Sequence, residues 1–237
     1  MENQDLPLTI IFILTTFLTV GLFYRASQKS MHILFILVPW LILQSVLSLG
    51  GFYQKTQTGP PRLLLMVGPP IILIIILFAT RVGRRFIDRL DPAMLVLIFI
   101  IRIPMELVLY GLFLDKMIPQ GMSFAGGNLD IFSGLSAPLI YYFGFQKKQL
   151  NRRIILLWNL ICLGLLLAVV IHAILAVPSP FQKLDFDQPN LAILYFPYTL
   201  LPSLVVPLVL FSQLALFRIL IRQSPSKLTP ANAPTFP

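Results

Sequence analysis

The chain has 237 residues, of which 57% are hydrophobic and only 11% charged, and it carries a formal net charge of +9. With a mean hydropathy of +0.86, this composition lies outside that of soluble globular proteins and is typical of membrane proteins. The basic residues lie in short connections between apolar runs, where they set membrane orientation. Nucleic acid is therefore excluded as the expected partner.

The apolar runs predict an all-α membrane protein, because a helix needs about 20 mainly apolar residues to span a bilayer. Together they predict a single polytopic transmembrane bundle over residues 1–222, of about seven helices. Prolines inside five of the seven runs predict several kinked helices. The expected helices cover residues 7–24, 33–53, 63–80, 93–114, 129–145, 154–177 and 196–220.

The charge distribution predicts the orientation of this bundle. Of the 18 Lys and Arg residues, 13 fall on one side of the predicted membrane and 4 on the other. Because basic loops stay in the cytoplasm, we expect the N-terminus outside and the C-terminus inside. Residues 223–237 are polar and rich in proline, which predicts a disordered cytoplasmic tail. The absence of any Asn-x-Ser/Thr sequon favours a bacterial plasma membrane, whose anionic lipids we expect against the basic inner face.

Cofactor and enzyme motifs are scarce in the sequence. The single cysteine, Cys162, excludes a Cys-based zinc site, and the two histidines are predicted near opposite membrane faces, so we expect no metal or other cofactor. Neither a phosphate-binding loop nor a nucleophile elbow occurs, and an enzyme is not favoured. Seven helices with an outer N-terminus resemble microbial rhodopsins in arrangement, but residues 196–220 contain no lysine for retinal, which limits the resemblance to topology.

Two ionisable residues near the middle of the run 93–114 are the strongest functional candidates. Arg102 and Glu106 stand four residues apart, so they share one helical face and are predicted to pair with each other. Pro104 between them frees the carbonyl of Ile100. One interpretation makes Glu106 a ligand for a proton or cation, with Arg102 tuning it or clamping an anion. The other makes the two a structural salt bridge, and the sequence leaves both open.

Further polar residues are weaker candidates. His172, near the outer end of its run, is a potential proton relay or partner of Glu106. For Gln44 and Asn159 we favour interhelical hydrogen bonds over ligand binding. In the outer connection 115–130, Asn128 and Asp130 are expected to cap the next helix. That connection begins with Asp115, and we expect it to dip into the membrane or cap the bundle.

These observations support three functions. The leading hypothesis is a protein that binds or transports a small solute or ion at an interior polar site around Arg102 and Glu106. The alternative is a non-catalytic membrane subunit that docks a larger membrane-protein assembly. A third is a lipid-modifying enzyme of the outer face that uses Asp115, Asp130 and His172.

Overall fold

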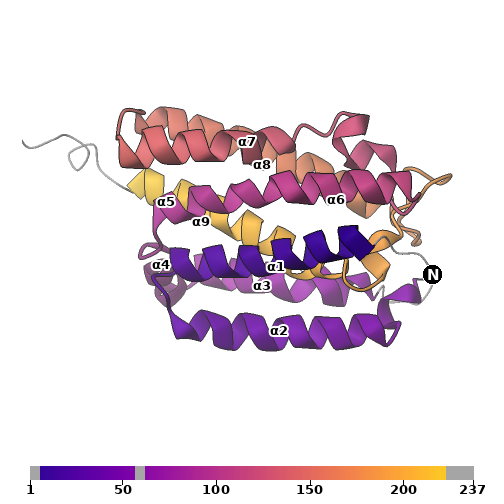
Figure 1. The fold of residues 1–237 in the computed structure, drawn as a ribbon. Coiled ribbons are helices and arrows are strands. Elements are labelled where there is room, and N and C mark those ends of the chain that lie inside the picture. The colour runs from indigo at the N-terminus through magenta and orange to yellow at the C-terminus, as the bar shows by residue number, and fades with distance from the viewer. Residues whose placement is uncertain (1–5, 57–61, 223–237) are drawn as a thin grey trace, which may run out of the picture.

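The computed structural model describes residues 6–56 and 62–222, so the predicted tail 223–237 lies outside the described residues. Within these two ranges the chain is all-helical and contains no strand. The helices lie side by side in one bundle, with α4 at one end (Figure 1). Their bounds are α1 Leu6–Ala26, α2 Met31–Leu49, α3 Leu63–Ala79, α4 Arg81–Ile87, α5 Pro92–Leu97, α6 Arg102–Leu114, α7 Ile131–Ile140, α8 Arg152–Leu175 and α9 Val206–Arg222.

Five helical stretches in the described part of the chain are long and apolar enough to cross a membrane. A sixth is added if α3 and α4, which meet at a bend of 95°, count as one span. These helices are compatible with an integral membrane protein. The five are α1, α2, the continuous stretch Pro92–Leu114, α8, and the stretch Leu201–Arg222.

The break between α3 and α4 was not predicted from the run 63–80. Thr80 leaves the helical conformation and its hydroxyl accepts a hydrogen bond from the amide of Gly83, which caps α4. The Arg84 guanidinium donates to the carbonyls of Phe78 and Ala79 at the end of α3. We call the end of the bundle where α4 lies the α4 end.

Irregular turns interrupt three of the predicted helices. The 3-10 turn η2, Ile98–Ile101, directly precedes Arg102. The π-helical turn η5, Tyr141–Gln146, continues α7 after Pro138, and the π-helical turn η7, Leu201–Val205, leads into α9. Such turns leave backbone groups outside the regular helical ladder, and π-turns are frequent at functional sites.

Most predicted boundaries differ from the observed ones by a few residues, and two of the differences have a clear structural form. The run 33–53 ends as a helix at Leu49, because Gly51 adopts a left-handed conformation with φ 67° before the short turn η1, Phe52–Gln54. In the run 196–220, the π-helical turn η7 begins only at Leu201, and the regular α-helix begins at Val206.

The core forms where α1, α7 and α9 pack against the stretch from α5 to α6, and α8 packs on α9. The small-residue face of α7 packs closely, as its sequence suggests: a Cβ at Gly134 would lie 2.9 Å from the Ile103 side chain and 3.2 Å from the Phe99 carbonyl oxygen. By contrast, only 11% of α2 is buried, and this helix lies at the edge of the bundle (Figure 1).

Candidate functional site: a buried polar cavity

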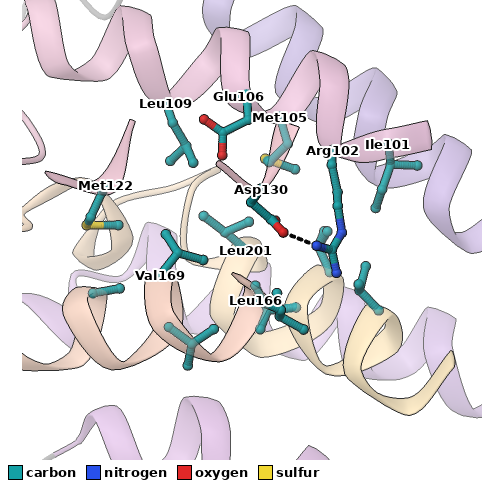
Figure 2. Close-up of a pocket in the computed structure, with 15 residues that line it drawn as sticks. Ile101, Arg102, Met105, Glu106, Leu109, Met122, Asp130, Leu166, Val169 and Leu201 are labelled. Atoms are coloured by element: carbon teal, nitrogen blue, oxygen red, sulfur yellow. Dashed lines mark hydrogen bonds and ion pairs between the residues drawn. The ribbon is translucent and has the colours of Figure 1, made fainter. Parts of the chain in front are cut away.

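A cavity of about 80 Å³ lies between α6, α8 and the η7–α9 segment. A water molecule needs at least about 10–15 Å³ of such space, so the cavity has room for a few waters or a small ion. Its walls are aliphatic except on one side, where three ionisable side chains converge (Figure 2). The lining residues include Arg102 and Glu106 from α6, Met122 and Asp130 from the following connection, Leu166 and Val169 from α8, and Leu201 and Val209 from the η7–α9 segment.

Arg102 forms a buried ion pair with Asp130. Its Nη1 donates to Oδ1 of Asp130, and the two residues are 4% and 6% exposed. The guanidinium also lies over the Phe99 ring, with its carbon 5.2 Å from the ring centroid. The Ser133 hydroxyl, one turn into α7, stands 3.4 Å from the same carboxylate oxygen. The pair therefore connects the start of α6 to the start of α7.

Glu106 is held by the amide of Asn128. The Nδ2 atom of Asn128 donates to Oε1 of Glu106 over 2.6 Å and to the carbonyl of Met122 over 3.0 Å. Asn128 Oδ1 accepts in turn from the amide of Asp130 over 3.0 Å. One side chain thus fixes the fold of the connection and orients the Glu106 carboxylate.

Several polar atoms of the site are buried without a hydrogen-bond partner among the described residues. They are Oε2 of Glu106 and both Nε and Nη2 of Arg102. Such atoms cost free energy unless a ligand or water satisfies them. Because the cavity contains one basic and two acidic groups, it has a formal charge of −1 when all three are ionised.

The sequence located this site but assigned its pairing wrongly. Arg102 and Glu106 do line the same cavity, yet each bonds to a residue of the connection rather than to the other. The capping prediction for Asp130 is also wrong, since its carboxylate accepts no backbone hydrogen bond at the start of α7. Asn128 accepts only from the amide of Asp130, ahead of the helix.

The connection between α6 and α7 covers one end of the cavity with two short 3-10 turns, η3 (Gln120–Met122) and η4 (Phe124–Gly126). Met122 reaches the cavity wall. A Cβ at Gly121 would lie 2.4 Å from the His172 ring, so only glycine allows η3 to pack this closely on α8. We call the segment from Lys116 to Leu129 the cover.

His172 does not reach Glu106. Its Nε2 atom lies 2.6 Å from Oδ2 of Asp185, and both side chains are partly exposed. His172 therefore supports the cover from outside the cavity.

The three residues of the lipid-modifying hypothesis have separate surroundings: Asp130 pairs with Arg102, His172 with Asp185, and Asp115 ends α6 at the surface. Within the described ranges, no three His, Cys, Asp or Glu side chains gather as a metal site would require.

The two amide candidates lie elsewhere. Gln44 is buried and accepts a 2.6 Å hydrogen bond from the Tyr53 hydroxyl, which ties α2 to η1 rather than to another long helix. Asn159 does make the expected interhelical bond, donating from Nδ2 to the backbone carbonyl of Gln213 on α9 over 3.0 Å.

Gln213 itself was missed by the sequence analysis. Its side chain is fully buried, and neither Nε2 nor Oε1 has a partner in the described part of the chain. It stands one turn beyond Val209 on α9, and Asn159 stands two turns before Leu166 on α8, so both amides continue the cavity walls toward the α4 end. The available signal was the only glutamine in a mainly apolar run.

No curated protein and no solved structure matches the chain. Residues 60–221 match the family described as Domain of unknown function (DUF8737). The matched range contains every residue that lines the cavity, whereas α1 and α2 precede it. Because the match covers more than half of the chain, this protein belongs to the family of the Domain of unknown function (DUF8737).

Proposed function

We propose that this chain is an integral membrane protein of a bacterial plasma membrane that binds and transports a small cation, or a small solute with a cationic group, at the cavity beside Glu106. The proposed topology has seven spans, with α3 as one and α7 with η5 as another. The N-terminus is outside and the C-terminus is cytoplasmic, which places the α4 end in the cytoplasm. The excess of Lys and Arg at that end supports this orientation.

One observation carries the proposal: Glu106 is 2% exposed, and its Oε2 atom has no partner in the described ranges although it lines a cavity. An ionised carboxylate in such a place is costly unless a counter-charge is near. Asp130 already compensates the charge of the Arg102 guanidinium, although Nε and Nη2 of Arg102 keep no hydrogen-bond partner among the described residues. The remaining negative charge favours a cation as the ligand.

The surrounding residues then have distinct roles. Glu106 is the ligand-binding carboxylate, and Asn128 fixes its orientation. The Arg102–Asp130 pair gives the cavity a polar wall whose own charges cancel, so that the net charge of the site is that of Glu106. Aliphatic side chains from α8 and α9 form the opposite wall, which suits the apolar part of a small organic cation. Transport requires the cover to move, and its broken, glycine-containing turns permit such movement more readily than a continuous helix would.

Ligand-dependent stability tests the proposal. A ligand that binds only the folded protein stabilises it by about 2.7 kcal/mol at a hundred times its dissociation constant. We expect one member of a panel of sodium, potassium, lithium and methylammonium chlorides to raise the unfolding temperature of the purified protein. Glu106→Gln should remove this shift while leaving the protein folded, because the glutamine carbonyl still accepts from Asn128.

Asp187→Asn is the matched control, because it removes the same charge from an exposed position outside the cavity. It should retain the shift. A cation response that survives Glu106→Gln would show that the cavity is not the binding site. A stoichiometric membrane protein that copurifies in gentle detergent, with no response to any cation or organic solute, would favour the docking subunit instead.

A further inference from the structure

A second, larger hollow lies on the opposite side of the bundle. It is a groove of about 770 Å³ between α2, α3, α4 and the η7–α9 segment. Its walls along the groove are aliphatic and aromatic, with Leu37 and Leu43 from α2 facing Leu73 and Leu77 from α3. The polar lining residues are confined to its two ends: Ser30, His32 and Thr80 at the α4 end, and Ser203 at the other.

The groove is closed at the end away from α4. The Trp40 indole nitrogen donates to the carbonyl of Ser203 over 2.8 Å, which connects α2 to the η7 turn. Beyond it, the hydroxyls of Ser48 and Thr199 are 2.6 Å apart. These two contacts hold the far half of α2 against the bundle. An occupant would therefore enter from the α4 end or from the side.

The α4 end of the groove is strongly basic. Exposed Lys29 adjoins the lining residue Ser30, and exposed Arg81 and Arg85 lie on α4 beside the lining residues Val82 and Phe86.

The two acids that the structure describes at this end are already engaged. Both carboxylate oxygens of Asp88 accept from Arg218 and Arg222, and Asp91 caps α5 by accepting from the amides of Ala93 and Met94. Neither Asp88 nor Asp91 is therefore left to neutralise Lys29, Arg81 and Arg85 at the groove entrance.

We propose that this groove is a binding site for an acyl lipid with an anionic phosphate headgroup. The acyl chain lies along the apolar walls between α2 and α3, and the phosphate lies at the α4 end near Arg81 and Arg85. A long slot that is apolar inside and basic at one end matches the amphipathic shape of such a lipid. The site is separate from the cavity and does not depend on what the cavity binds.

Native mass spectrometry of the full-length protein, with added phosphatidylglycerol or phosphatidylcholine of the same acyl chains, tests the headgroup preference. We expect phosphatidylglycerol to be retained preferentially. Arg81→Gln/Arg85→Gln should reduce this preference by roughly twenty-fivefold, since each basic residue near an anionic lipid raises the affinity by about fivefold. Lys147→Gln/Lys148→Gln is the control: it removes two exposed lysines that lie outside the groove, and it should leave the preference unchanged.

A second pair of variants tests the position of the acyl chain. Ile36→Trp/Leu73→Trp fills the groove from both walls and should abolish retention of either lipid. Val46→Trp/Ile75→Trp adds the same bulk to exposed positions of the same two helices outside the groove, and should bind as the unaltered protein does. If the two tryptophan double variants retained the same amount of lipid, the proposal would be overturned. It would also be overturned if the purified protein carried no lipid and a partner helix, present in stoichiometric amount, covered the groove.

Discussion

Arg102 and Asp130 are 28 residues apart in the sequence and form a buried ion pair between the starts of α6 and α7. This pair determines where the connection from Lys116 to Leu129 lies, and thereby places Asn128 against Glu106. The geometry of the whole cavity depends on a contact that neither helix contains by itself.

Removal of either member of this pair should destabilise the fold. Arg102→Gln or Asp130→Asn leaves one uncompensated buried charge, which costs about 3–5 kcal/mol. The double variant leaves two neutral amides that can hydrogen-bond, so it should recover most of this loss. Thermal unfolding of all four proteins in one detergent measures the coupling, and additive losses in the double variant would contradict a direct interaction.

The hydrogen bond between Asn128 and Glu106 should survive an exchange of the amide and the carboxylate between the two positions, but not the loss of the amide alone. Asn128→Asp places two carboxylates at a donor–acceptor distance of 2.6 Å and should lower the unfolding temperature markedly. Adding Glu106→Gln restores the pairing with the two groups exchanged: the amide now stands at position 106 and donates to the carboxylate at position 128. We therefore expect the double exchange to unfold at a higher temperature than Asn128→Asp alone, while still failing to bind the cation. No recovery of stability would mean that Asn128 acts mainly through the carbonyl of Met122.

Water access to the cavity can be measured by thiol labelling. In a Cys162→Ser background, Glu106→Cys should react with a small membrane-impermeant methanethiosulfonate reagent, because the movement of the cover that transport requires would open the cavity to water. Val108→Cys is the matched control on the same helix, since Val108 is 1% exposed and does not line the cavity. Protection of both cysteines in folded protein would favour a dry, structural role for the ionisable residues.

Substitution of Gln213 can separate an effect on stability from an effect on transport. Both of its buried side-chain polar atoms lack partners in the described ranges, so Gln213→Leu removes unsatisfied groups at similar volume. The unfolding temperature should stay constant or rise. If Gln213 also contributes to passage of the cation toward the α4 end, liposome flux should fall in the same variant. A clear loss of stability would instead reveal a structural hydrogen bond to water.

The sequence by itself determined the helical, membrane-compatible character of this protein, because about 20 consecutive apolar residues have few alternatives in lipid. It also singled out Arg102 and Glu106, since ionisable residues inside an apolar run are rare and costly. Helical periodicity placed both on one face, and the cavity lies on that face.

Only the tertiary structure decided which groups meet. The local rule for residues four apart predicted a pair within α6, but Asp130 and Asn128 approach from a segment whose position depends on the packing of α7 and of the cover on α8. The bend of 95° after α3 and the groove behind it likewise depend on how α4 packs, which hydropathy does not encode. Apolar patterns specify which segments are buried, whereas side-chain partners depend on distances between segments that the pattern leaves undefined.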